Sequence, residues 1–481
     1  MALLHSFQYE EAGKAFSEIT QQDPHCAMAY WGLAMSLYQQ LWNFPDAATL
    51  KKGYKDVEKA RNVVAKTDRE REYIAAAAAF YQNDPKLSHT ARTEAYSKAM
   101  AEIYERNPAD VNAGAFYALS LVALAQDGVN DLQNRKHAIA ILDKLFATHP
   151  DNPGVDHYLI HASDDPRLAS FGLAAARNYA KIAPDSAHAL HMPSHIFTRL
   201  GYWQDSVHSN LASAAAAEEA TQSGRDDEWG YQMHALSFLE YAYLQSGRSE
   251  DARRVVGEVM KVPGDTTALD LAENQALFEV TYAIENHAWK TAAALTLPAG
   301  DRYAGDSEEI YWARTIGAAR RGDVAGARQD FQKLKEASAA VEIEVKKRGE
   351  KPASGESVAQ MEAEAWLDDA EGHHHQAVEM MRAAAAKEGP YGVDILGMPA
   401  QEMLGDLLME LHQPRPALAA YESGLKESPN RFDGLYGAAR AAELAGDTGK
   451  ARAYYAQLVK ICGSEADRKE YREARVFLAK N

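Results

Sequence analysis

Two histidine pairs carry the clearest chemical signal in this sequence of 481 residues. One pair is His157 and His161 in the run HYLIH, and the other is His191 and His195 in the run HMPSH. Residues four apart lie on the same face of a helix, so each pair presents two imidazoles side by side. His191 follows His157, and His195 follows His161, by the same number of residues. This predicts that the two pairs occupy equivalent positions on corresponding helices of two successive repeats.

Imidazole nitrogens arranged in this way suit a transition-metal ion. The axes of packed helices lie about 8–10 Å apart, so histidines on neighbouring helices reach an ion between them at about 2.0–2.1 Å per nitrogen. The expected cofactor is a divalent transition metal, with zinc as the first choice and copper or iron as alternatives.

A repeat in the C-terminal part of the chain predicts the elements that position these histidines. Ala417 and Ala451 are separated by the same interval as the histidine pairs, and so are Tyr421 and Tyr455. This interval is the period of the tetratricopeptide repeat, in which small residues allow two helices to cross closely and an aromatic ring fills the gap to the next pair of helices. The sequence predicts an all-α, right-handed α-solenoid of tetratricopeptide-like helix pairs with irregular spacing.

The repeat register places the histidines on one surface. With Ser206 at position 20 of its repeat, the pair in HMPSH takes positions 5 and 9 of the first helix, as does the pair in HYLIH. Positions 2, 5, 9 and 12 are those that resemblance to tetratricopeptide repeats assigns to the concave surface. The predicted metal ligands on this surface are His157, His161, His188, His191, His195 and His234.

Two further residues beside the histidines are candidates for a catalytic role. Tyr158 and Asp164, the latter at position 12, are expected to carry protons or to orient a ligand, which favours a metal-dependent hydrolase or oxidase. A metalloprotease of the H-E-x-x-H type is excluded, because Tyr158 stands where that motif has glutamate. Acyl transfer and nucleotide chemistry lack their usual glycine-containing motifs.

Two other interpretations of the histidines remain open. They would bind the carboxylate of a peptide in a polar groove, or they would be structural residues that hydrogen-bond to their neighbours. The alternative function is therefore a non-enzymatic scaffold, with a peptide, protein or small-molecule ligand in the concave groove.

The charge and composition of the chain limit the kinds of partner that it is expected to bind. A formal net charge of −18 argues against nucleic acid and against an anionic membrane surface, because both require clustered Lys and Arg. No apolar run is long enough to insert into a membrane. The polar stretch 347–357 predicts a division into an N-terminal superhelix, 1–346, which carries the histidines, and a C-terminal array, 358–481.

Several segments resemble a group of bacterial tetratricopeptide-repeat proteins of no established activity. The resemblance spans nearly the whole chain and is carried by LLHSFQYEEAGKAF, DPHCAMAYWGLAMSLY, HYLIHASDDP, HALHMPSHIFTRLG and NRFDGLYGAARAAELAGD. It implies a leader before the LLHSF stretch and hence a periplasmic or secreted protein, with a cytoplasmic protein as the alternative. The sequence departs from the group at Ser237, where relatives have an acidic residue, and at 389–399, where relatives have a longer loop with a histidine.

Overall fold

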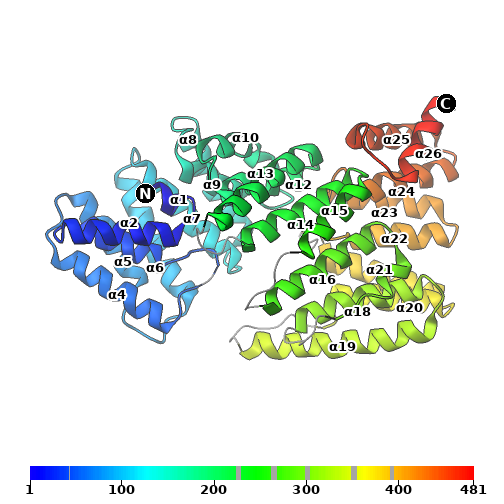
Figure 1. Ribbon diagram of the computed structural model, residues 1–481, viewed down its shortest axis with the longest axis horizontal. Helices are drawn as coiled ribbons and strands as arrows, with labels where there is room; N and C mark the ends of the chain where they lie inside the picture. The colour runs from blue at the N-terminus through cyan, green and yellow to red at the C-terminus, as the bar shows by residue number, and fades with distance from the viewer. Residues whose placement is uncertain are drawn as a thin grey trace. The chain divides into compact units, whose positions relative to one another are not determined.

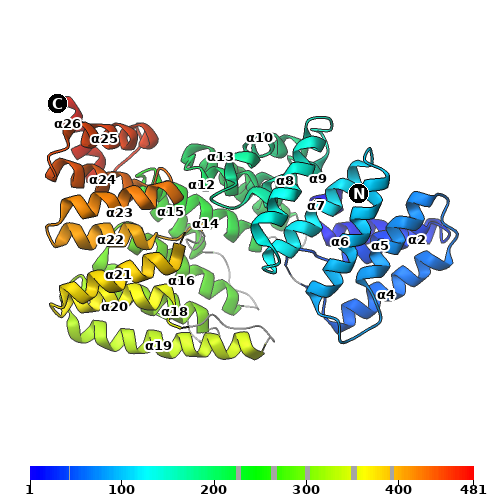
Figure 2. The same cartoon turned by 180° about the vertical axis from the view of Figure 1, so that it is seen from behind.

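The computed structural model describes residues 1–42, 44–223, 229–261, 268–297, 304–347, 355–389 and 395–480. Within these ranges the chain forms helices and turns and contains no strand, which confirms the predicted all-α array of helix pairs. The helices follow one another as antiparallel hairpins, and the hairpins α20/α21, α22/α23 and α24/α25 lie one after another in Figure 2.

The chain divides into two compact units, Met1–Ile196 and Phe197–Asn481, and each is described by itself. The predicted division between 1–346 and 358–481 stays a prediction, since residues 348–354 lie outside the described part of the chain. Residues 390–394 also lie outside the described part of the chain. They belong to the stretch 389–399, where the sequence differs from the bacterial proteins that it resembles.

The first unit runs from the N-terminus to the middle of α12 (Figure 1). Its helices are α1 (Ala2–His5), α2 (Tyr9–Gln22), α3 (Ala27–Ser36), α4 (Ala47–Asn62), α5 (Asp68–Phe80), α6 (His89–Arg106), α7 (Val111–Gln126), α8 (Asp131–Phe146), α9 (Pro153–Ser163), the 3-10 helix η1 (Ala169–Gly172), α10 (Leu173–Ile182), α11 (Ala187–His191) and α12 (Pro193–Arg199).

The second unit holds the remaining helices, drawn from green to red in Figure 1. They are α13 (Trp203–Gln222), α14 (Trp229–Gln245), α15 (Ser249–Val259), α16 (Ala268–Glu285), α17 (Trp289–Ala292), α18 (Ala304–Ala319), α19 (Val324–Lys347), α20 (Val358–Ala370), α21 (His374–Glu388), α22 (Ala400–Glu410), α23 (Pro414–Glu427), α24 (Phe432–Leu444), α25 (Thr448–Cys462) and α26 (Lys469–Lys480).

Small residues at the predicted crossing points allow the hairpins to pack. Tyr421 on α23 is buried between α22 and α24, where it faces Gly405 and Gly437. A Cβ atom would lie 2.6 Å from the Tyr421 ring at Gly405 and 2.3 Å from it at Gly437, so neither position accepts a side chain without displacing the ring. Ala417 and Ala451, the repeat positions that the sequence singled out, are fully buried.

Local signals fix the helices that carry the histidines. Asn152 caps α9, because its side-chain oxygen accepts hydrogen bonds from the backbone N–H groups of Gly154 and Val155, and Pro153 takes the first helical position. The helix that begins at Ala187 is interrupted before Pro193, which lacks an N–H group, and α12 continues from there.

The second unit departs from a simple solenoid, in which each repeat contacts only its neighbours. Arg431, at the start of α24, is buried and donates hydrogen bonds of 2.9 Å to Glu285 on α16 and to Glu402 on α22. Its guanidinium group also donates to the hydroxyl group of Tyr241 on α14, far earlier in the sequence. Helices distant in the sequence are thereby joined, so the unit closes on itself.

Among the described residues, no helix combines the length and the apolar character that crossing a bilayer requires.

Candidate metal centre

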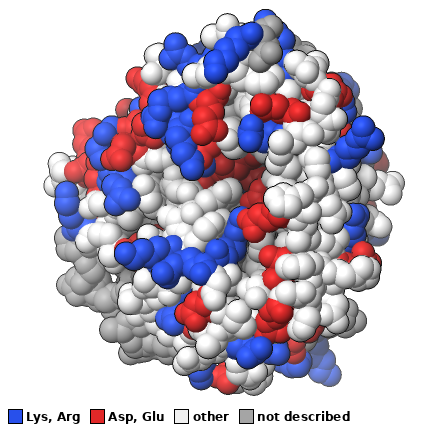
Figure 3. All heavy atoms as spheres, turned by 90° about the vertical axis from the view of Figure 1, so that its right-hand side faces the viewer, with Lys and Arg blue, Asp and Glu red and all other residues white. Residues whose placement is uncertain are grey.

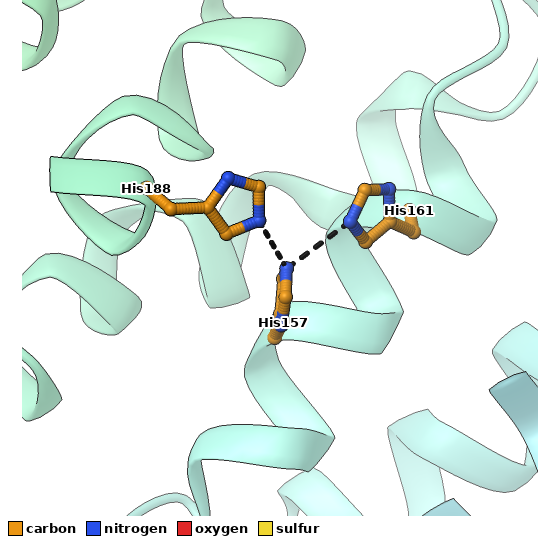
Figure 4. A group of neighbouring side chains, drawn as sticks. All are labelled: His157, His161 and His188. Carbon is orange, nitrogen blue, oxygen red and sulfur yellow. Dashed lines mark hydrogen bonds between the residues drawn. The ribbon is translucent and has the colours of Figure 1, made fainter. Parts of the chain in front are cut away.

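Three imidazoles of the first unit direct their Nε2 atoms toward one point. The Nε2 atom of His157 lies 2.9 Å from Nε2 of His188 and 3.1 Å from Nε2 of His161, and the three nitrogens lie within 4.8 Å of one another. Figure 4 shows two of the rings on successive turns of α9 and the third on α11, all facing inward. The structure therefore brings together three of the six predicted ligands.

A hydrogen bond fixes the protonation of His157. Its Nδ1 atom lies 2.6 Å from the backbone carbonyl oxygen of His5. A carbonyl oxygen only accepts hydrogen bonds, so Nδ1 carries the proton and donates it. In the neutral ring the lone pair is then on Nε2, the atom that faces the other two histidines. Metal-binding histidines are oriented in this way by a partner on the second ring nitrogen.

Burial keeps two of these imidazoles uncharged. His157 is fully buried, and His161 and His188 are each only 8% exposed. Burial lowers the pKa of His157 to about 3, and it lowers the pKa of His161 well below the usual value, with neighbouring histidines adding to the shift. Metal ligands must be unprotonated, so His157 and His161 have the required protonation state at neutral pH.

The distances between the rings are those of hydrogen bonds, and they lie close to the spacing that a metal ion requires. Around a tetrahedral zinc ion, nitrogens at about 2.0–2.1 Å from the metal are about 3.3–3.4 Å apart. The Nε2 atoms, which are 2.9 and 3.1 Å apart, would reach this spacing if the rings moved by a few tenths of an ångström. Without an ion, the single lone pair on Nε2 of His157 faces two nitrogens and satisfies at most one of them well.

Aromatic side chains from the N-terminal part of the unit cover the cluster, although the sequence placed the histidines on a concave surface. The Phe7 ring lies 4.3 Å from the His157 ring and 5.4 Å from the His161 ring, centroid to centroid. Trp42 lies 5.6 Å from His161 and is partly exposed at its outer side. The apolar cover reduces access of water and strengthens polar interactions beneath it.

A second layer of residues holds the backbone of His5 in place. The Nε2 atom of His5 lies 3.0 Å from the side-chain oxygen of Asn112, and its Nδ1 lies 3.0 Å from the hydroxyl of Tyr158. An amide oxygen only accepts, so Nε2 of His5 is the donor and the Tyr158 hydroxyl donates to Nδ1. A Cβ atom at Gly154 would lie 2.3 Å from Nδ1 of His5, so only glycine at that position admits the ring.

Tyr158 and Asp164, the predicted catalytic residues, occupy different surroundings. Tyr158 is fully buried and faces His5, so its hydroxyl supports the cluster from behind. Asp164 accepts a hydrogen bond of 2.9 Å from Nδ1 of His195. Their roles in a reaction stay predictions.

The second histidine pair forms its own contact in the first unit. The Nε2 atoms of His191 and His195 are 3.0 Å apart, and Asp164 orients the His195 ring so that its Nε2 lone pair faces His191. His234, the sixth predicted ligand, is exposed on α14 in the second unit and is not part of the three-histidine cluster. The other three predicted ligands, His191, His195 and His234, thus lie outside the buried triplet.

Comparison with known proteins identifies the kind of repeat. Residues 402–466 match the family model for the tetratricopeptide repeat. This segment contains the hairpins α22/α23 and α24/α25, in which the predicted small and aromatic positions pack against one another. This segment of the chain therefore consists of tetratricopeptide repeats. No curated protein matches the sequence of the chain.

The solved structures that match the chain are distant from it in sequence. The human IFIT1 dimer with PPP-AAAA is 12% identical, with a TM-score of 0.39 over 94% of this chain and 95% of that chain. A tetratricopeptide repeat protein from Parabacteroides merdae is 13% identical, with a TM-score of 0.34 over 61% of this chain and 97% of that chain. The Cut9-Hcn1 hetero-tetramer of the APC/C is 11% identical, with a TM-score of 0.34 over 98% of this chain and 87% of that chain.

Proposed function

We propose that this protein is a metal-binding tetratricopeptide-repeat scaffold that holds a zinc ion through His157, His161 and His188. The observation that supports the proposal most strongly is the convergence of three buried Nε2 atoms. Those of His188 and His161 lie 2.9 and 3.1 Å from that of His157. The orientation of His157 by the carbonyl oxygen of His5 supports it as well, because it directs the Nε2 lone pair of His157 toward the other two histidines.

The composition of the ligand set favours zinc, with copper or iron as alternatives. Three neutral nitrogens suit all three metals, and the triplet includes no thiolate or carboxylate. Three histidines leave one tetrahedral position open, which is typical of catalytic zinc sites and untypical of structural ones.

An open position favours a metal-dependent hydrolase or oxidase. The bound metal would supply either an activated water molecule or a redox centre. The chain's own residues would orient the ligands and move protons. Asp164, about one-fifth exposed and bonded to His195, is placed to exchange protons with solvent. Tyr158 acts in this proposal as a positioning residue through His5.

The test is a zinc titration of the metal-free protein against a competing chelator. The wild-type chain is expected to bind one zinc ion tightly at the triplet, and His161→Ala/His188→Ala is expected to lose that binding. His149→Ala, which removes an exposed histidine of the same unit, serves as the matched control and should titrate like the wild type. Equal zinc binding by the double variant and the control would refute the proposal.

A second candidate function is the binding of a peptide, protein or small molecule in a concave groove. The observation that favours it is a cavity of about 230 Å³ in the second unit, lined by Asp406, Asp433, Tyr436 and Arg440. In the register set by Ala417 and Ala451, these residues take positions 9, 2, 5 and 9, which are among the positions expected on the concave surface.

A further inference from the structure

The cavity in the second unit has walls from several repeats. The residues that line it include His287 after α16, Arg320 after α18, Asp406 and Glu410 on α22, and Glu470 on α26. Its volume of about 230 Å³ exceeds the cavity of about 150 Å³ that accommodates benzene, and it is smaller than the sites of about 300–1,000 Å³ that take drug-sized ligands. A group the size of one amino-acid side chain fits such a space.

Two polar atoms in the wall have only long contacts with each other and with Arg320. The Nε2 atom of His287 is buried, makes no hydrogen bond with the described residues, and lies 3.5 Å from Oδ2 of Asp406. The same Oδ2 is 3.4 Å from the guanidinium group of Arg320. Both distances exceed the usual 2.7–3.2 Å of an N–H···O hydrogen bond. A group with N–H donors that enters the cavity would make a shorter hydrogen bond to Oδ2 of Asp406.

Other contacts hold the guanidinium group of Arg320 away from Oδ2 of Asp406. The Arg320 guanidinium lies 4.3 Å from the Trp289 ring centroid and 4.0 Å from the Trp366 ring centroid, and it also pairs with Glu410. Stacking on two aromatic rings fixes the plane of the guanidinium group. Arg320 therefore cannot shift to make a shorter bond to Asp406 without losing both rings.

The charges around the cavity are predominantly negative. Its lining includes the carboxylates of Asp406, Glu410, Asp433 and Glu470, against the guanidinium groups of Arg320 and Arg440. Arg468 neutralises Asp433 through hydrogen bonds of 2.8 and 3.0 Å, and Glu443 offsets Arg440 at 2.7 Å. Acidic side chains lie in the recessed centre of the face in Figure 3, with basic side chains beside them.

We infer that this cavity binds an organic cation, an ammonium or guanidinium group, which donates to Asp406. The inference rests on the second candidate function and is independent of the metal proposal. A cation with several N–H donors meets the long-range contact of Asp406 Oδ2 and the excess of negative charge in the lining. The rings of Tyr421 and Tyr436 in the lining provide faces for its apolar stem.

The inference is tested by calorimetric titration with defined probes. Agmatine and an acetylated, amidated Gly-Arg-Gly peptide carry the same guanidinium group, as a small molecule and as a peptide side chain. The same peptide with citrulline in place of arginine is the neutral control ligand. Binding of either guanidinium probe, with the citrulline peptide at least tenfold weaker, supports the inference, and the tighter of the two shows the source of the cation.

Variants localise the binding. Asp406→Asn keeps an acceptor for Tyr421 and removes the charge, and it should weaken binding at least tenfold. Glu410→Gln provides a second test if Asp406→Asn unfolds, with a loss of about threefold or more. Glu379→Gln, an exposed change on α21, is the matched control.

Two outcomes would overturn the inference. One is the absence of binding by both guanidinium probes, or equal binding by Asp406→Asn and the control. The other is tight binding of zinc alone that Asp406→Asn abolishes, which would make the cavity a metal site. Because His161→Ala/His188→Ala leaves this cavity intact, unchanged agmatine binding by that variant separates the inference from the zinc proposal.

Discussion

The Nδ1 atom of His157 lies 2.6 Å from the backbone carbonyl oxygen of His5, a contact between residues 152 positions apart. This hydrogen bond places the lone pair of His157 at the point where His161 and His188 converge. The N-terminal turn therefore belongs to the site, because it determines which nitrogen of the central histidine is available to a metal.

Gly154→Ala tests this dependence without touching a proposed ligand. The added Cβ atom would lie 2.3 Å from Nδ1 of His5, so the His5 ring and its carbonyl oxygen must shift. Loss of a partner that orients a metal ligand typically weakens metal binding about 10- to 100-fold, and we expect a loss in that range by competition with a chelator.

The control for this variant is Gly257→Ala on α15, where an added Cβ meets no atom within 4 Å. Its zinc affinity should equal that of the wild type. Unchanged zinc binding by Gly154→Ala, with a shifted His5 established by crystallography, would contradict the role given to the His5 carbonyl.

The variant Tyr158→Phe tests whether the Tyr158 hydroxyl supports the histidine cluster or takes part in catalysis. Removing the hydroxyl leaves Nδ1 of His5 without its donor in a buried place, which costs about 1–3 kcal/mol in the free energy of unfolding. Because Tyr158 does not face the Nε2 atoms, we expect the zinc stoichiometry to stay at one. Denaturant unfolding and metal analysis measure the two effects, and a stability equal to the wild type would contradict this placement.

The repeat register explains how far the sequence could predict the site. The register placed six histidines on one surface, and the structure brings His157, His161 and His188 of that set together. The shared interval itself relates His157 to His191 and His161 to His195, which the structure places in different groups. The roles of His5, Phe7 and Trp42 could not be read from the register. Their contacts join segments that are distant in the sequence, and no local spacing encodes such a contact.

Arg431→Met tests the closure of the second unit. The change leaves Glu285 and Glu402 buried without their common cation, and breaking a buried pair in this way costs about 3–5 kcal/mol in stability. Thermal unfolding should show a clear loss. Replacing both glutamates with glutamine in the Arg431→Met background should recover part of it, and full stability of the single variant would contradict the closure.

The fold itself was largely predictable, and its closure was not. Ala417, Tyr421 and their counterparts one repeat later report a packing rule that acts between neighbouring helices, so the sequence shows it directly. Arg431 appears in the sequence as one arginine among many. Its burial depends on Glu285 and Tyr241, which precede it by 146 and 190 positions, and a repeat pattern does not specify such contacts.

Glu388→Gln should change how stability depends on pH. Burial raises the pKa of Glu388 to about 7 from an ordinary value of 4.5, although the carboxylate accepts a hydrogen bond from the Ala400 N–H. Between these two pH values the folded chain holds a proton that the unfolded chain releases, so the contribution of Glu388 to stability falls as pH rises from 4.5 to about 7.

The glutamine variant keeps an acceptor for Ala400 and cannot ionise. We expect it to be more stable than the wild type at pH 8, by roughly 2 kcal/mol at most, and equal to it near pH 4.5. Denaturant unfolding at several pH values measures this difference. An identical pH dependence of the two proteins would contradict the raised pKa.

Anomalous X-ray diffraction at the zinc edge, on crystals grown with one equivalent of zinc, tests the central claim most directly. The account predicts one strong peak about 2.0–2.1 Å from the Nε2 atoms of His157, His161 and His188, absent from crystals of His161→Ala/His188→Ala. A zinc-free triplet in the wild-type crystals, with the ion elsewhere or absent, would contradict it.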